Sequence, residues 1–318
     1  MASSNDTSST TTLPTNDTDG MQIPVGLSSL LIRVVTYNIR YAATGSSLQD
    51  GEQVWDGIRG PRVTSQLRFT TLNTPAAFIN LQEVLKPQLD SILAGLNNST
   101  TSPPPPPPQL RQNGPTSAPI LYRPSIWELS NWTTIWLSET PEVPSKGWDA
   151  GSTRILTIGE FVHRESGRGV VAMNTHFDNA GSVSGDNSAR IVTEEILARQ
   201  SGGSRGGNGA TKPVILTGDF NSEPKQEAYQ YLTKENSPVE DLREQVPEAE
   251  RYGNRIETFT RFDRGDEAHT LIDHILVDKK SAWEVRTYGV LANVFDGGGG
   301  YYSDHQAVVS DLRLDLEA

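Results

Sequence analysis

The sequence of 318 residues contains no cysteine. Disulfides, thiolate nucleophiles and cysteine-based zinc sites are therefore excluded, and a reducing compartment such as the cytoplasm is favoured. No apolar run approaches the roughly 18 residues of a membrane-spanning helix, and the N-terminus lacks the charged-then-apolar pattern of a signal peptide, so we expect no membrane span. Localisation stays open, because secretion would suit the Asn-x-Ser/Thr sequons that begin at Asn5, Asn16, Asn97, Asn98 and Asn131.

Basic residues are scarce as well. The chain has 27 Lys and Arg against 39 Asp and Glu, which gives a net charge of −12. An extended nucleic-acid groove usually needs a basic face, because neutralising phosphates supplies most of the non-specific affinity. The charge therefore disfavours a processive nuclease, whereas a local basic patch or a small phosphorylated substrate remains compatible with it.

The hydrophobic fraction is only 35%, because segments rich in Ser, Thr, Asn, Pro and Gly dilute it. Residues 1–28 are nearly free of apolar side chains, so we expect a disordered tail. We expect three further segments to be surface loops: residues 97–117, which include the prolines from Pro103 to Pro108, residues 201–210 and residues 297–300. The remaining apolar runs suffice for one core, so we assign residues 29–318 to a single domain.

Short apolar runs rich in β-branched and aromatic residues predict many strands. They are Leu30–Ile39, Ala76–Leu81, Ile120–Tyr122, Ile126–Leu137, Ile155–Val162, Val170–Thr175, Val214–Thr217, Ile272–Val277, Val285–Leu291 and Ala307–Leu312. Helices are predicted at Ser188–Gln200, Pro87–Leu96 and Pro224–Leu232. Many strands with a few interspersed helices favour two sheets packed face to face with helices outside.

Polar residues collect where the predicted strands end, which is a rigid place to mount catalytic groups. Taken alone, each of them is more simply explained as a turn former, a cap or a solvated charge. Their joint occurrence on similar strand ends indicates one site, formed by Asn38, Glu83, His176, Asp219, Asn221, Asp273, Asp304 and His305.

The chemistry of these residues is that of metal-assisted hydrolysis. Glu83 and Asp304 supply anionic oxygen and Asn38 a carbonyl oxygen, a ligand set that suits magnesium, with manganese as the alternative ion. Asp219, Asn221 and Asp273 are expected to orient water and a histidine.

Two histidines complete the expected machinery. His305 beside Asp273 would be an imidazole oriented by a carboxylate, while His176 and Asn221 would donate hydrogen bonds to phosphate oxygens.

Two arginines, Arg154 and Arg190, are candidate phosphate-binding residues, although an ordinary surface role explains each equally well. Asp178 follows the strand that ends at His176. It either contacts substrate or metal, or holds a loop, and the sequence does not distinguish these roles.

The order of the motifs resembles the endonuclease/exonuclease/phosphatase superfamily. The motifs are Tyr37–Asn38, Leu81–Gln82–Glu83, Asn174–Thr175–His176, Gly218–Asp219–Phe220–Asn221, Ile272–Asp273–His274–Ile275 and Ser303–Asp304–His305. The resemblance spans residues 31–314. Within the superfamily, the chain is most similar to a subgroup of small fungal and bacterial members. The resemblance implies an α/β fold, a four-layer α/β/β/α sandwich of two packed mixed sheets flanked by helices. It also implies hydrolysis of phosphoesters with a divalent metal, so that residues 29–318 would be a catalytic domain.

One loop departs from the pattern of that subgroup. Where small members carry Gly-Arg-Asp-Asp-Gly and then Gly-Glu, this chain has Arg111–Gly114 followed by Pro115–Pro119. Both loop carboxylates become amides and the following glutamate is missing, so substrate choice is where this chain is expected to differ.

Three functional hypotheses follow. The first, which the sequence favours most, is a phosphodiesterase or nuclease, including an exonuclease acting on RNA. The second is a phosphomonoesterase acting on a small phosphorylated metabolite or lipid headgroup, which the acidic charge favours. The third is a phosphate-binding protein without catalysis, which the altered loop motivates. The expected partner is therefore a phosphoester substrate, either nucleic acid or a small molecule. The sequence indicates no protein partner, so a monomer is the default.

Overall fold

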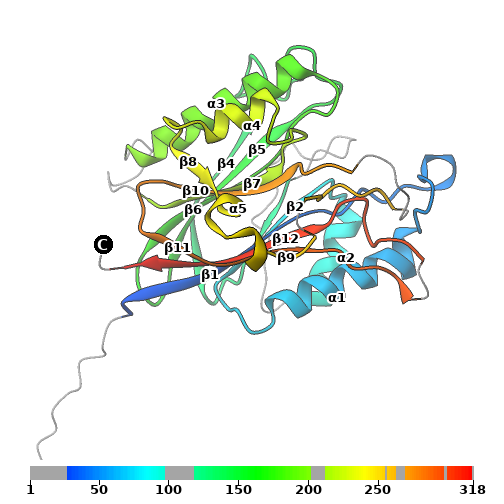
Figure 1. Cartoon of the computed structure of the whole chain (residues 1–318), viewed down its shortest axis with the longest axis horizontal. Helices are drawn as coiled ribbons and strands as arrows, with labels where there is room; N and C mark the ends of the chain where they lie inside the picture. Colours follow the sequence, from blue (N-terminus) through cyan, green and yellow to red (C-terminus); the bar gives the residue numbers. More distant parts are fainter. Residues whose placement is uncertain are drawn as a thin grey trace, which may run out of the picture.

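The computed structural model describes residues 27–96, 118–201, 212–254, 256–262, 269–296 and 299–316. Two six-stranded mixed sheets form the middle of the molecule, and helices cover their outer faces (Figure 1). The predicted α/β/β/α sandwich is therefore confirmed. The predictions for residues 1–26, 97–117, 202–210 and 297–298 lie outside the described residues, as does most of the Arg111–Pro119 loop.

The first sheet has the strand order β3-β2-β1-β12-β11-β9. Helices α1 (Gly60–Thr71) and α2 (Lys86–Leu96) pack on its outer face, where Val63 and Ile92 meet Tyr37 and Leu81. Short turns Gly45–Ser47 and Trp55–Arg59 precede α1. Its strands are β1 (Ser29–Asn38), β2 (Ala77–Gln82), β3 (Ile120–Leu121), β9 (Tyr252–Gly253), β11 (Trp283–Leu291) and β12 (Ala307–Asp315).

The second sheet has the order β4-β5-β6-β7-β10-β8. Helices α3 (Ser182–Gln200) and α4 (Glu227–Thr233) cover it through Val192, Ile196 and Leu232. Its strands are β4 (Trp127–Trp136), β5 (Ile155–His163), β6 (Gly169–His176), β7 (Val214–Asp219), β8 (Val239–Asp241) and β10 (Asp273–Asp278).

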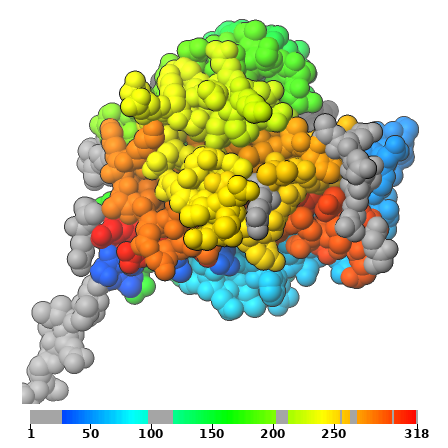
Figure 2. All heavy atoms as spheres, viewed as in Figure 1, coloured from blue at the N-terminus to red at the C-terminus, as the bar shows by residue number. Residues whose placement is uncertain are grey.

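The segment between β8 and β9 joins the edges of the two sheets. It contains α5 (Leu242–Gln245) and a 3₁₀ turn at Glu248–Glu250, and it occupies the middle of the face seen in Figure 2, drawn in yellow. Leu242 and Val246 from this segment enter the core between the sheets. The segment therefore closes one side of the sandwich. Among the described residues, every helix is too short or too polar to cross a membrane.

The sequence located all the longer strands, but it misjudged several helix boundaries. Helix α3 begins at Ser182 and not at Ser188, because the Asp149 side chain accepts the backbone N–H groups of Val183 and Ser184 at its first turn. A Cβ atom on Gly181 would lie 2.4 Å from Asp149 Oδ1, so this capping contact needs glycine there. Helix α1, helix α5 and the short strands β8 and β9 were not predicted.

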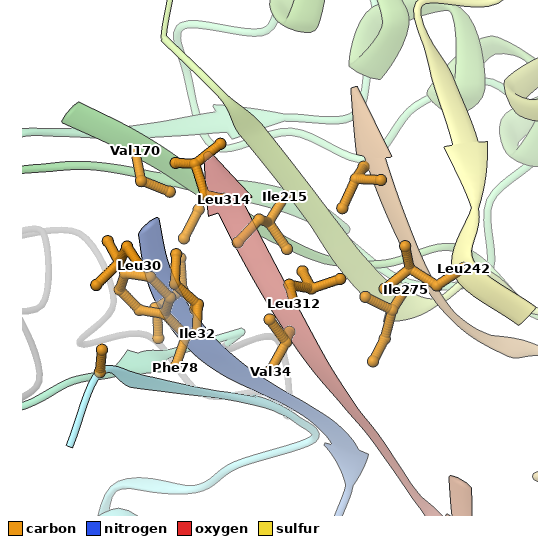
Figure 3. Packing of buried hydrophobic residues seen from close by; sticks show 14 of the residues in the cluster. Leu30, Ile32, Val34, Phe78, Val170, Ile215, Leu242, Ile275, Leu312 and Leu314 are labelled. Atoms are coloured by element: carbon orange, nitrogen blue, oxygen red, sulfur yellow. The ribbon is translucent and has the colours of Figure 1, made fainter. Parts of the chain in front are cut away.

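Side-chain alternation along the central strands builds the core between the sheets. Ile32 and Val34 on β1 point inward, whereas Val35 and Tyr37 point outward to the helices. Figure 3 shows the inward set meeting across the sandwich: Leu30, Ile32, Val34, Phe78, Val170, Ile215, Leu242, Ile275, Leu312 and Leu314. Tryptophans contribute to this packing as well, because Trp127 and Trp136 are buried and Trp132 packs against the core.

The inward series becomes polar toward one end of the strands. Thr36, Gln82, Asn174 and Thr217 are all fully buried. Gln82 Nε2 donates to Thr36 Oγ1 at 3.0 Å and to Asn174 Oδ1 at 2.7 Å, which connects the two sheets. Asn174 Nδ2 and Thr217 Oγ1 also donate to backbone carbonyls, so hydrogen bonds offset much of the free-energy cost of burying these polar groups. They form a polar layer between the apolar core and the residues described next.

Candidate active site

The next inward residues along the same strands are the predicted site residues. Strand β1 ends at Asn38, β6 at His176 and β7 at Asp219, while β10 begins at Asp273. His176 pairs with Asp219 in the parallel β6–β7 ladder, and Asp273 pairs with Asp219 in the antiparallel β7–β10 ladder. The period of two that buries the core therefore also delivers these side chains to one edge of the sandwich.

A cleft of about 520 Å³ opens at this edge. Seven of the eleven predicted residues line it: Glu83, Arg154, His176, Asp219, Asn221, Asp304 and His305. Asn38 and Asp273 are fully buried and contact lining residues from behind.

Backbone strain is concentrated at the cleft. Arg40, Glu83 and Asn221 have φ angles of 55°, 58° and 44°, and all three line the cleft. Residues other than glycine adopt this left-handed conformation at a cost of about 1 kcal/mol or more, and such residues cluster at functional sites. The strain turns the chain sharply where each strand ends, which brings these side chains to the cleft.

Two carboxylates offer oxygen ligands to a cation. Glu83 accepts the backbone N–H of Tyr41 at 3.3 Å, and Asp304 Oδ2 accepts Gln49 Nε2 at 3.2 Å. Both line the cleft, and the Glu83 side chain is partly exposed. They provide the hard anionic oxygen atoms that a cation such as Mg²⁺ prefers.

Asn38 is oriented differently from the sequence prediction. Its Oδ1 accepts the backbone N–H of Arg40 at 3.0 Å, so its Nδ2 faces Asp219 Oδ2 at 3.0 Å and Glu83 Oε1 at 3.3 Å. A backbone N–H can only donate, which fixes the orientation of the amide. In this arrangement Asn38 holds two carboxylates by donating to them and does not turn its oxygen toward the cleft.

His305 lies between two carboxylates. Its Nδ1 is 2.8 Å from Asp273 Oδ2 and its Nε2 is 3.5 Å from Asp219 Oδ2, while His176 Nε2 approaches the same Asp219 oxygen at 3.3 Å. Ligand atoms of Asp219, Asp273 and His305 lie within 4.8 Å of one another, which makes this group a second candidate for holding a metal ion.

Burial and charge shift the protonation of this group. Burial alone would lower the pKa of His305, but Asp273, Asp219 and Asp304 outweigh it and raise that pKa to about 10, so the imidazole is cationic. Burial raises the pKa of the Asp219 carboxyl, although His305 opposes the shift. Burial, with smaller contributions from Arg154 and His305, holds the pKa of His176 well below its usual value, so His176 is neutral.

Arg154 lines the cleft, and neighbouring side chains hold its guanidinium. Its Nε lies 3.3 Å from Asp178 Oδ2, and its Nη2 donates to Asn179 Oδ1 at 3.2 Å. Asp178 also accepts four backbone N–H groups, those of Gly151, Ser152, Ala180 and Gly181 at 2.9 to 3.0 Å. Of the roles left open by the sequence, the structure places Asp178 as a loop-holding residue behind the arginine, because it does not line the cleft.

Arg190 lies away from the cleft. It is on α3, and its guanidinium sits 4.5 Å from the centre of the Tyr231 ring. It is absent from the residues that line the cleft. Of the two roles left open for Arg190, this position on the exposed outer layer fits the ordinary surface role and not a phosphate contact in the cleft.

Several lining residues escaped the sequence reasoning. Arg40 and Gln49 follow the first motif, and a search of the residues just after Asn38 would have found Arg40. The others lie on loops whose positions depend on the whole fold: Tyr41, Ser152, Asn179, Glu223, Gln226, Phe259, Thr270 and Ile272.

A two-sheet sandwich with a cleft of carboxylates and histidines at the strand ends defines the structural class, and comparison with known proteins identifies the family. A model of the endonuclease/exonuclease/phosphatase family matches residues 35–305. The chain therefore belongs to this family, as the motif order predicted.

Solved structures agree with this assignment. An endonuclease/exonuclease/phosphatase family protein from Bacteroides thetaiotaomicron is 28% identical, with a TM-score of 0.75, over 91% of this chain and 97% of that one. A mannosyl-6-phosphatase of the same organism is also 28% identical, with a TM-score of 0.72, over 88% of this chain and 99% of that one.

Two further comparisons are more limited. The catalytic domain of human Nocturnin is 19% identical with a TM-score of 0.59, over 89% of this chain and 93% of that one, a likeness that shows the fold alone. Uncharacterized protein L388 of Acanthamoeba polyphaga mimivirus is 29% identical over 109 residues, which are 33% of this chain and 37% of that protein.

Proposed function

We propose that this protein is a divalent-metal-dependent phosphoester hydrolase and that its substrate is a small phosphomonoester. The observation that carries the proposal is the convergence of Glu83, Asp304, Asp219 and His305 on one cleft of about 520 Å³. That volume suits a small molecule. The same cleft also presents Arg154, a cation able to bind phosphate oxygens.

The residues fit a divalent cation. Glu83 and Asp304 would hold it, since both are anionic oxygen donors on the cleft wall and Asn38 fixes Glu83 by donating to it. When bound, such an ion polarises a phosphoryl oxygen and lowers the pKa of water. Magnesium is the proposed ion, with manganese as the alternative.

The remaining residues handle the proton and the charge. Water attacks phosphorus as the bond to the leaving oxygen breaks, and the leaving oxygen takes up a proton from solvent water and departs as the alcohol. Asp219 is placed to take the proton of the attacking water, since its raised pKa makes it a better base than an ordinary aspartate. Asp273 orients His305 and stabilises it as a cation. His305 and Arg154, which both line the cleft, then stabilise negative charge on the phosphoryl oxygens.

Charge and similarity favour a small phosphomonoester over nucleic acid. The chain carries a net charge of −12. Of the two arginines that line the cleft, Arg40 already faces the Glu83 carboxylate. A relative that is 28% identical across nearly its full length is a mannosyl-6-phosphatase, which supports a phosphorylated sugar as the first compound class to test. A phosphodiesterase or nuclease is the second candidate, because the family is named for such enzymes.

A metal-by-substrate panel tests the proposal. We expect release of phosphate from hexose 6-phosphates with Mg²⁺ or Mn²⁺, and little cleavage of bis-p-nitrophenyl phosphate or short RNA. Glu83→Gln, which keeps the shape and removes the charge, should abolish turnover. If the chain cleaved only the diesters, the phosphomonoesterase proposal would be wrong and the phosphodiesterase or nuclease would take its place. Binding of a phosphorylated sugar without turnover under any divalent metal would favour a phosphate-binding protein without catalysis.

A further inference from the structure

A buried ion pair lies beneath the metal side of the cleft. Arg59 and Glu52 have fully buried side chains, and Arg59 Nη2 lies 3.0 Å from Glu52 Oε1. Replacing such a pair by apolar residues often leaves a protein equally or more stable, so burial of charge by itself is a weak reason for the pair to exist. The contacts that the pair makes with other segments explain it better.

Arg59 joins the loops that carry the site residues. Its guanidinium donates to the backbone carbonyls of Ile39 at 2.9 Å, Arg40 at 3.4 Å and Tyr41 at 3.3 Å, just after Asn38. It also donates to the carbonyl of Tyr302 at 3.3 Å, two residues before Asp304. One side chain thus fixes the distance between the loop after β1 and the loop before β12, which are far apart in sequence.

Glu52 extends the connection to both proposed metal carboxylates. Its Oε2 accepts the backbone N–H of Gln49 at 3.0 Å, and Gln49 Nε2 donates to Asp304 Oδ2 at 3.2 Å. The same Oε2 lies 3.7 Å from Arg40 Nε, and Arg40 Nη1 lies 3.8 Å from Glu83 Oε2. Glu52 is therefore connected to Asp304 through Gln49 and to Glu83 through Arg40.

We infer that the Glu52–Arg59 pair is a positioning device that sets the two metal carboxylates in place before the ion binds, acting through Gln49 and Arg40. The inference rests on the proposed function, since it assumes that Glu83 and Asp304 hold the metal. Partners one step behind metal ligands commonly change metal affinity by roughly 10- to 100-fold when they are removed. A purely structural pair would change the unfolding temperature and leave metal affinity unaltered.

The experiment measures Mg²⁺ and Mn²⁺ affinity of the full chain by titration calorimetry, alongside unfolding temperature and the Mg²⁺ concentration that gives half-maximal hydrolysis. The variants are Glu52→Gln, which keeps size and removes charge, and Gln49→Ala at the cleft wall, which leaves the buried pair intact. Asp311→Asn is the matched control, because it breaks another arginine–carboxylate pair, Arg33–Asp311 at 2.7 Å, that does not line the cleft.

We expect Gln49→Ala, which removes a direct partner of Asp304, to weaken metal affinity by roughly 10-fold or more. Glu52→Gln should weaken metal affinity in the same direction, and added Mg²⁺ should recover most of the turnover lost in either variant. Asp311→Asn should lower the unfolding temperature with metal affinity unchanged. If the wild-type chain binds the ion and both test variants bind it equally well, the positioning role is refuted while the proposed function stands. If the wild-type chain itself binds no divalent ion, the proposed function fails and this inference fails with it.

Discussion

Asp178 provides a quantitative test of how the cleft is built. Its carboxylate accepts four backbone N–H groups and faces Arg154. Although burial opposes ionisation, these hydrogen bonds lower the pKa of Asp178 from 3.8 to about 2. At 1.36 kcal/mol for each pKa unit, the ionised carboxylate stabilises the folded state by about 2 kcal/mol at neutral pH.

The sign follows from the lowered folded-state pKa. The stabilisation is fully present above the unfolded pKa near 4 and is lost as pH falls toward 2, so about 1 kcal/mol should already be gone at pH 3. Asp178→Asn keeps the shape, but it places an amide nitrogen against backbone donors. We therefore expect the free energy of unfolding of this variant to be lower than that of the wild-type chain by at least about 2 kcal/mol at pH 7.

Chemical denaturation of the wild-type chain and Asp178→Asn, at several pH values from 3 to 7, measures this difference. The gap in unfolding free energy should narrow by about 1 kcal/mol between pH 5 and pH 3, because the Asp178 carboxyl of the unfolded wild-type chain takes up a proton in this range while that of the folded chain stays mostly ionised. A gap that stays constant over that range would refute the assignment of the stabilisation to the ionised carboxylate. Phosphate binding is an independent readout, because Asp178→Asn should displace Arg154 and so weaken the binding of phosphate.

Three further predictions concern the metal, the base and the core. Glu83→Gln should abolish divalent-ion binding in calorimetry while Asp273→Asn retains it, and the reverse pattern would place the ion in the Asp219–Asp273–His305 group. Because burial raises the pKa of Asp219, kcat/KM should fall with decreasing pH at values well above 4, and an acid limb near pH 4 would exclude Asp219 as the base. Phe78→Ala should lower the unfolding free energy by about 3 to 5 kcal/mol in denaturant, since Phe78 is fully buried against Trp127 and Phe161, and a loss below 1 kcal/mol would contradict that packing.

The strands and their polar ends could be predicted because their signals are local. An apolar run that alternates with period two and then becomes polar identifies both the strand and the residue it presents, as at Val34, Thr36 and Asn38. The register could be anticipated only in part, since parallel neighbours such as β6 and β7 bring His176 and Asp219 together through pairings that no single segment encodes.

The features that escaped prediction depend on distant contacts. The start of α3 depends on Asp149, and the orientation of Asn38 depends on a backbone N–H of Arg40. Arg190 carries the same charge as Arg154, yet it lies on the outer helical layer, because its place on α3 sets it beside Tyr231. The different roles of two arginines cannot be predicted from composition and spacing, because they depend on which distant segments each side chain contacts in the folded chain.

The buried network also explains why the site occurs at this edge of the sandwich. The space between the sheets is apolar around Val34 and Ile215, polar at Thr36 and Thr217, and charged at Asp219. A charge placed directly on the apolar core would meet the full desolvation cost. The intervening layer of hydrogen-bonded side chains separates the Asp219 carboxylate from the apolar core. In that position the carboxylate accepts a hydrogen bond from Asn38 Nδ2 and lies 3.5 Å from His305 Nε2. The polar layer is therefore as much a requirement for the chemistry as the residues that line the cleft.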